Sequence, residues 1–393
     1  TLSTPNYDAL LIGWAALPNI PTGITLDAGD SLYSNGSSNA KNTLTTPTAS
    51  GGKGWNITDG GETYSFVDNT EFRTAVNLWL SNNSQAESIH GTIGSWNIGN
   101  ITDCSGLFQN QTSFNTDIGD WDVSNVTTFL RMFEGCTSFD QDLKDWNTHS
   151  ALKMGHMFSG CSSFNQSIRN WNVTNNSVFA SMFKNASDFD QALDIWDTSS
   201  AVNMAYMFNG CTSWTCNNGI SDWNVNLVTN FNSMFKDMDS GNNLFDNNLD
   251  ISSWNIASAQ YLDEMFNGST MSSEKYTQLL LTWGDSGNTS PPNNITFHAG
   301  SSKYYSSVIT EKTHLTTSTA SGGKGWTITD GGEVPTPFIS NGNSGSMPDH
   351  YWNFSQNLQD QIGTWHFDSS VLETTYNNTT YGLGYGSNDD IIL

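Results

Sequence analysis

The chain has 393 residues, of which only 13% are charged, and its 38 acidic residues outnumber its 13 basic residues to give a net charge of −25. This length allows two or three domains. So few basic residues cannot form a positively charged stripe, which argues against nucleic acid and anionic membranes as partners. No apolar run approaches the roughly 18 residues that a transmembrane helix needs.

Asn, Ser, Thr and Gly dominate the polar residues, a composition that favours an extracellular or cell-surface protein. The chain starts at Thr1 without Met or a signal peptide, which suggests a processed or excised chain. Five Cys residues are too few for a disulfide-dense scaffold. Cys136, Cys161 and Cys211 share a repeat position with an alanine, which predicts free core thiols. Stacked coils would also bring Cys136 and Cys161 within disulfide range, so a bond between them is the alternative. A bond between Cys211 and Cys216, which flank an insertion, stays an open alternative.

Residues 1–62 form the first predicted unit, a flanking helix-and-strand module. Tyr7, Leu10, Leu11 and Trp14 have helical spacing, and the segment 50–62 predicts a strand that ends in Asp-Gly-Gly. Residues 63–95 follow as an N-terminal cap for the next region. Their predicted helix has the apolar spacing of Phe72, Ala75, Val76, Trp79 and Leu80.

Residues 96–270 repeat one pattern seven times, with a Trp followed twelve residues later by a Phe that has Leu or Met before it. The step is 25 residues four times, then 27 and 31, which predicts a solenoid of stacked coils. In each coil an apolar stripe such as Val126, Phe129, Met132 and Phe133 predicts a short helix, and the remainder predicts a short strand. The Trp, Met and Phe positions are expected to form core ladders rather than ligand platforms.

An Asn or Asp follows every one of the seven Trp residues, which predicts an Asx turn in each coil. A ladder that binds a cation or a sugar is the alternative reading of this row. Its members are Asn97, Asp122, Asn147, Asn172, Asp197, Asn224 and Asn255.

Residues 271–333 are a second copy of the flanking module, because the segment 50–62 returns almost unchanged at 321–333. Two explanations remain open: a unit of about 270 residues recurs in a longer parent chain, or the copies are the two end modules of one array. Residues 334–348 have the composition of a linker. Residues 349–393 alternate aromatic and polar residues, which predicts a β-rich tail. That tail is either an incomplete sandwich or a strand donated to a neighbour.

The phrase from Ser124 to Phe139 resembles the 25-to-26-residue, lipoprotein-related repeat of BspA-like bacterial surface proteins, and the likeness spans about residues 62–270. The tail from His350 is similar, over few residues, to the opening strands of laminin-G-like domains. The first resemblance implies a leucine-rich-repeat-like solenoid on a secreted or surface-anchored protein. It implies adhesion or matrix roles and carries no catalytic residues.

The motifs that carry chemistry are weak, and no catalytic site, cofactor site or cofactor is predicted. Asp237, Asp239, Gly241 and Asn242 faintly resemble a calcium loop, but Asn248 stands where the bidentate Glu belongs, so calcium is only a weak alternative. Asn-x-Ser/Thr motifs are frequent. The candidate glycosylation sites are Asn35, Asn56, Asn82, Asn100, Asn110, Asn125, Asn165, Asn172, Asn185, Asn267, Asn294, Asn353 and Asn377.

The repeats therefore predict a non-enzymatic extracellular structural protein, a module of a surface fibre, filament or matrix that associates with itself. The alternative is an adhesin that binds glycans or cell-surface proteins through exposed aromatic residues. The candidates are Trp214, Tyr304, Tyr305 and Tyr351, although Trp214 aligns with the core position of Phe139, Phe164 and Phe189. A carbohydrate-active enzyme is a lesser alternative, since paired carboxylates are plentiful.

Overall fold

The computed structural model describes residues 2, 4–215, 219–238, 249–285 and 291–334, together with four short strands between residues 374 and 392. The chain divides into two compact units, residues 1–336 and residues 337–393. The first unit holds both flanking modules and the coil array, which is the name used below for residues 96–270.

The first module contains two helices and two pairs of parallel strands, one helix and three strands more than the sequence indicated. β1 pairs with β3, and β2 pairs with β4. The second helix buries only Leu44, so its sequence carries no apolar periodicity by which to predict it. The elements are α1 (Thr4–Ala15), β1 (Thr25–Asp27), β2 (Leu32–Ser34), α2 (Ser38–Thr45), β3 (Asn56–Thr58) and β4 (Gly61–Thr63), with single 3₁₀ turns at Asn35–Ser37 and Thr48–Ser50.

Two helices and a 3₁₀ turn lead into the array: α3 (Asn69–Ser81), α4 (Asn83–His90) and Ile93–Ser95. Asp68 caps α3 by accepting hydrogen bonds from the Thr70 and Glu71 amides. The ring of Phe72, on the buried face of α3, lies 5.4 Å from that of Trp121 in the second coil. The helix predicted from residues 72–80 is therefore present and packs against the first coils.

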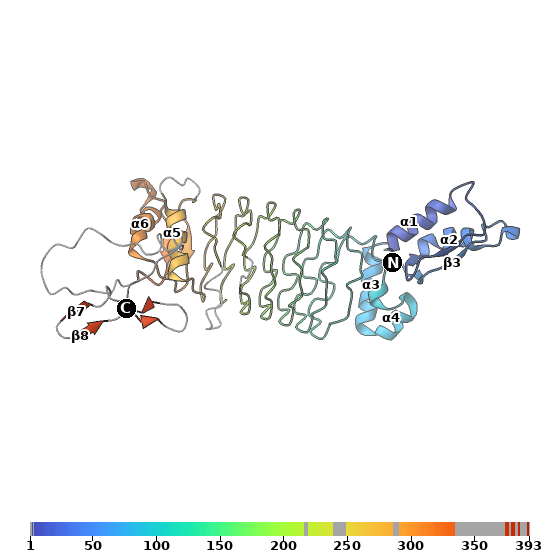
Figure 1. The fold of residues 1–393 in the computed structure, drawn as a ribbon, viewed down its shortest axis with the longest axis horizontal. Coiled ribbons are helices and arrows are strands. Elements are labelled where there is room, and N and C mark those ends of the chain that lie inside the picture. The colour runs from blue at the N-terminus through green and yellow to red at the C-terminus, as the bar shows by residue number, and fades with distance from the viewer. Residues whose placement is uncertain are drawn as a thin grey trace. The chain divides into compact units, whose positions relative to one another are not determined.

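The coils of the array lie one upon the next, as Figure 1 shows. Alternate amides in each coil donate to carbonyl oxygens of the following coil. The Phe108 amide, for example, donates to Met132 at 2.9 Å and the Phe133 amide to Met157 at 3.0 Å. One residue per coil also forms a parallel bridge to the next coil. This row runs through Asp103, Thr128, Lys153, Val178, Asn203, Asn230 and Tyr261.

The short helix predicted in every coil was wrong, because the described residues between Trp96 and Met271 form turns and contain no helix. A helix would direct all its amides along its own axis. Here every second amide points to the neighbouring coil instead. Arg131 and Gly135 also have positive φ angles, of 61° and 76°, which no right-handed helix allows. Stacking imposes turns on an apolar spacing that, in isolation, resembles a helix.

The Trp, Met and Phe positions lie in the core, as predicted. Successive Phe rings from Phe108 to Phe235 stack with centroids 5.6 to 6.0 Å apart. Each array Trp is buried and donates its indole N–H to a carbonyl of the preceding turn, such as Trp171 to Leu143 at 2.9 Å. These bonds satisfy the only polar atom that the indole would otherwise bury unpaired.

The second module has the same order of helices as the first, and it continues the stack of coils. Phe297 bridges to Leu262 of the last coil on one side and pairs with Ile328 on the other. Its elements are α5 (Ser273–Gly284), β5 (Thr296–His298), a 3₁₀ turn at Ser306–Val308, α6 (Ile309–Thr316), a 3₁₀ turn at Thr319–Ser321 and β6 (Thr327–Thr329).

The second unit is described only by four strands. β7 (Thr374–Tyr376) pairs antiparallel with β8 (Thr379–Tyr381), and β9 (Gly384–Tyr385) pairs antiparallel with β10 (Ile391–Ile392). The predicted linker beyond residue 334 and the remainder of the tail lie outside the described residues.

Candidate binding surface

The Asx row predicted along one edge of the array consists of turns. In all seven coils the side-chain Oδ1 accepts a hydrogen bond from the backbone amide two residues later, at 3.0 to 3.4 Å. The row therefore shapes the backbone of each coil and confirms the turn interpretation.

A different row of the array carries backbone strain. At the position two residues before each core Phe, φ lies between 54° and 61°, and after Gly106 in the first coil every residue there has a side chain. The left-handed conformation costs a non-glycine residue roughly 1 kcal/mol. Bonds between coils hold it, such as that from the Arg131 amide to the Gly155 carbonyl at 3.0 Å. The row continues through Arg131, His156, Ser181, Tyr206, Ser233 and Glu264.

A second row, three residues further along each coil, lies beside the strained one. We call the two rows together the display face. In the second coil Glu134 joins them, because it accepts hydrogen bonds from Arg131 at 2.8 Å and from Gln109 of the coil before at 2.6 Å. The members of the second row are Gln109, Glu134, Ser159, Lys184, Asn209, Lys236 and Asn267.

The display face carries several of the chain's few cationic groups. Lys236 pairs with Glu264 at 2.6 Å, and this bond raises the pKa of the lysine and lowers that of the carboxyl. The Lys184 ammonium lies 5.1 Å from the centre of the Tyr206 ring. Burial, followed by the charge of Arg131, lowers the pKa of His156. The face therefore combines charges of both signs with an aromatic ring and an imidazole.

Sequence reasoning missed this face because the strained row has no shared residue type. The core slots repeat Trp, Met and Phe, whereas the strained row reads Arg, His, Ser, Tyr, Ser and Glu. Aligning the coils on their Phe residues would have shown two variable positions, the strained row and the residue before it, between apolar ones. Only the longer side chains of the two rows, such as Arg131 and Tyr206, reach solvent, because Ser159, Ser181, Asn209 and Ser233 are buried. Varied, exposed side chains on a constant scaffold are the arrangement expected of a recognition surface.

The aromatic residues proposed from the sequence do not form one cluster. Trp214 is buried, and its ring is stacked 3.9 Å from that of Phe208, so it belongs to the core. Tyr304 is half-buried beneath the Lys312 ammonium, and Tyr305 is exposed. Tyr351 lies outside the described residues.

Most of the candidate glycosylation sites are exposed. Asn267 is half-buried and donates its amide N–H to Glu264 at 2.7 Å. The side chain of Asn35 and the residues Asn353 and Asn377 lie outside the described part of the chain. The exposed sites are Asn56, Asn82, Asn100, Asn110, Asn125, Asn165, Asn172, Asn185 and Asn294, whose modification stays a prediction.

The array cysteines are free thiols in the core, as predicted. Cys136 donates its S–H to the Phe108 carbonyl at 3.0 Å, and burial raises its pKa to about 12. Burial also raises the pKa of Cys211, which donates to the Phe183 carbonyl at 2.7 Å. Such thiols are poor nucleophiles. Cys216 lies outside the described residues, so its bond to Cys211 stays a prediction.

The faint calcium loop falls mostly outside the described residues, which include Asp237 but not Asp239, Gly241 or Asn242. Within the described part of the chain, no group of three or more His, Cys, Asp or Glu side chains is placed to hold a metal ion. The same residues contain no helix that is long and apolar enough to cross a membrane.

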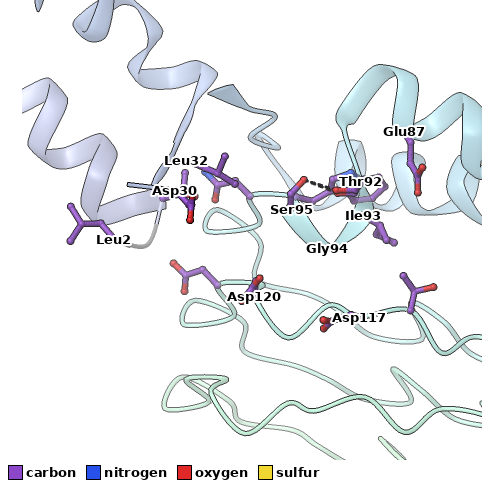
Figure 2. A pocket seen from close by; sticks show the side chains of 15 residues that line it. Leu2, Asp30, Leu32, Glu87, Thr92, Ile93, Gly94, Ser95, Asp117 and Asp120 are labelled. Atoms are coloured by element: carbon purple, nitrogen blue, oxygen red, sulfur yellow. Dashed lines mark hydrogen bonds between the residues drawn. The ribbon is translucent and has the colours of Figure 1, made fainter. Parts of the chain in front are cut away.

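One hollow beside the first two coils is lined by several carboxylates. Figure 2 shows Asp117 and Asp120 on one stretch of the first coil, with Glu87 on a nearby helix. The hydrogen bond drawn joins the Ser95 hydroxyl to the Thr92 carbonyl at 2.8 Å. A cluster of carboxylates does not by itself define a site. The carbohydrate-active alternative therefore stays a prediction.

Comparison with known proteins places the repeat. No curated protein and no solved structure matches the chain. One family, described as "Mycoplasma protein of unknown function, DUF285", matches residues 79–194 and again residues 177–284. Together the matches cover residues 79–284, more than half of the 393 residues, and both lie mainly on the coil array. The chain is therefore a repeat protein that belongs to this family of unknown function.

Proposed function

We propose that the protein is a non-enzymatic structural protein of the cell exterior, a module of a surface fibre, filament or matrix. The coil array would serve as a stiff, leucine-rich-repeat-like solenoid. The observation that supports this most strongly is one continuous hydrophobic core that runs from Phe66 to Trp326. An uninterrupted core of stacked rings suits a spacer that transmits load.

The bonds between coils support the same proposal. Amides, indole N–H groups and thiols all donate to carbonyl oxygens of an adjacent coil, so bending the array would break many bonds at once. The resemblance to BspA-like surface repeats and the polar, weakly charged composition support a location outside the cell. Self-association into a fibre and glycosylation are parts of the proposal.

Electron microscopy of the native secreted material tests it. Continuous filaments with a regular axial repeat are expected, and fractionation should find the protein outside the cell or on its surface. Dispersed single particles in undiluted material would overturn the filament, and a purely intracellular location would overturn the whole proposal.

Adhesion is the second candidate, and the display face favours it. A partner of mixed polarity, such as a glycan or a cell-surface protein, would contact Arg131, His156 and Tyr206 along the strained row. Serine occupies the same row at Ser181 and Ser233, so Arg131→Ser and Tyr206→Ser keep residues that this backbone accepts.

A screen of glycans and surface proteins would find the ligand. Combining Arg131→Ser with Tyr206→Ser should then weaken binding of that ligand about tenfold or more if the row contains anchor residues. Lys144→Ser is the matched control, because Lys144 is exposed and paired with Asp142 on another edge of the array. Equal binding by both variants would exclude the display face.

A further inference from the structure

The two flanking modules are copies, and they differ in what covers them. Residues of the first module correspond to residues of the second at an offset of 269 in the first helix and 271 thereafter. Tyr7 and Tyr276 donate their hydroxyl protons to Asp59 and Asp330, each at 2.7 Å. The copies therefore share internal bonds as well as sequence, and their residues correspond position by position.

In the second module the last coil of the array covers strand β5. The Phe266 amide donates to the His298 carbonyl at 2.9 Å, and the Phe266 and Phe297 rings lie 6.2 Å apart. The apolar residues that the structure describes on this side of the module are buried. These residues are Met271, Leu279, Trp283, Ile295, Phe297 and Ala299.

In the first module the corresponding side of strand β1 is open. Leu2 is 42% exposed where Met271 is 4% exposed, and Ile24 is 37% exposed where Ile295 is 5% exposed. Leu10, Trp14 and Leu26 are only partly buried, and together with Leu2 they line a hollow. We call this surface the β1 face; its residues are Leu2, Leu10, Trp14, Ile24, Leu26, Ala28 and Gly29.

One glycine in each module shows whether a coil backbone could lie against the β1 face. Gly29 and Gly300 have φ angles of 60° and 67°. At Gly300 a Cβ atom would lie 2.5 Å from the Phe266 carbonyl oxygen and closer still to that of Ser269, both in the last coil. At Gly29 a Cβ would meet no atom of the described residues within 4 Å. Gly29 thus leaves the space that a coil backbone fills at Gly300, and no described residue fills it.

The backbone at Leu2 follows the course that the chain takes as it leaves the array. The Leu2 amide donates to the Ser31 hydroxyl at 2.8 Å, and the Met271 amide donates to the corresponding Ser302 hydroxyl, also at 2.8 Å. In the second module this bond fixes the segment that directly follows the last coil. A coil joined to Leu2 would therefore arrive at the β1 face without rearrangement.

The direction of the coil bonds identifies which end of an array would fit. On the segment of each coil that contains the core Phe, alternate amides donate to the coil that follows. This segment of the last coil therefore presents donors, and the His298 carbonyl of β5 accepts from the Phe266 amide. Asp27 holds the corresponding carbonyl in β1. In this chain the last coil is already covered by the second module, so a different array must supply the coil.

We propose that the β1 face is the docking surface for the last coil of another array of this repeat, which precedes the module in the same polypeptide. The β4 side of the module already leads into an array, because Ser65 bridges to Asn97 of the first coil. The module thereby becomes a joint that ends one array and starts the next. This inference stands whether or not the protein forms fibres.

The test is a tandem chain in which residues 1–270 are followed directly by residues 2–393, so that Thr270 precedes the second Leu2. Hydrogen exchange is measured on segments 24–30 and 261–269, each of which occurs twice. Docking predicts that one of the two 24–30 populations exchanges about tenfold or more slowly than in the single chain. Both 261–269 populations should stay slow. The proposal would be overturned if segment 24–30 exchanged as fast as in the single chain and one of the two 261–269 populations exchanged quickly.

Variants confined to the internal module sharpen the test. Leu26→Asp should abolish the slow 24–30 population, whereas Ile12→Asp should preserve it. Ile12 is the matched control, because it is exposed on α1 and its counterpart Leu281 is exposed as well. Circular dichroism of the single-chain variants shows that each module still folds. If 24–30 becomes slow in a concentrated single chain, a second copy covers the face and the tandem arrangement is wrong.

Discussion

The two flanking modules share twelve of the thirteen residues in the segments 50–62 and 321–333, yet they are stabilised in different ways. The first has a small core of its own, built around Tyr7, Leu11, Leu44 and Trp55. The second shares the continuous core of the coil array. Local sequence thus determines the fold of each module, while its neighbour determines how much apolar surface becomes buried.

A polar cluster common to both modules shows that local sequence determines the fold of each module. Lys41 lies 2.8 Å from Asp59 and 4.0 Å from the centre of the Tyr33 ring. In the second module Lys312 lies 2.7 Å from Asp330 and 4.1 Å from the Tyr304 ring. These distances agree within 0.1 Å whether or not a coil covers the module.

A charge placed at equivalent apolar positions should give the largest difference in unfolding free energy between the two modules. Phe297→Asp puts an unpaired carboxylate between the second module and the last coil, and it should cost about 4 kcal/mol or more of unfolding free energy. Leu26→Asp, on the open β1 face, should cost only about 1 kcal/mol. Urea unfolding measures both. Equal losses would mean that the two faces are equally covered.

The next largest effect should be equal in the two modules. Asp59→Asn and Asp330→Asn each leave a largely buried lysine without its counter-ion, which should cost about 3 kcal/mol. Thermal unfolding followed by circular dichroism would detect either loss. Asp142→Asn, which removes an exposed partner of Lys144, is the control and should leave stability unchanged. A large difference between the two modules would show that the clusters are not equivalent.

The glycine pair should give a smaller but more specific difference. Alanine at either position loses stability because the backbone φ angle is positive, but Gly300→Ala must also displace the last coil. Gly300→Ala should therefore cost about 2 kcal/mol more than Gly29→Ala. Chemical denaturation of the two single variants measures the difference. If the costs match, the last coil does not approach Gly300 as closely as the structure shows.

The array core and the Asx turns could be predicted because a constant period places identical residues in contact, as with Phe133 and Phe158. The turns within each coil could not, since apolar residues at Val126, Phe129 and Phe133 suit a helix equally well until neighbouring coils compete for the amides. The display face depends on φ angles that Arg131 and Tyr206 do not reveal in a sequence. Likewise, the sequence shows that Leu26 and Phe297 correspond, but burial alone distinguishes them.

The smallest effect should appear only at alkaline pH. Burial, reinforced by Asp59 and Asp330, raises the pKa of Tyr7 and Tyr276 above the usual value of 10.0. Below pH 10 both hydroxyls are protonated in the folded and unfolded states, so their full contribution is present. As the pH rises above 10, the unfolded chain releases these protons while the folded chain retains them, and stability falls.

The unfolding free energy should therefore decline less steeply between pH 9 and 11 in Tyr276→Phe than in the unmodified chain. Tyr7→Phe should also flatten the decline, because Tyr7 donates to its carboxylate at the same 2.7 Å without a covering coil. The remaining tyrosines are common to all three proteins and cancel in the comparison. A slope unaffected by either substitution would mean that neither burial nor the neighbouring carboxylate raises the pKa of these tyrosines, and the polar cluster could then not be what makes the two modules alike.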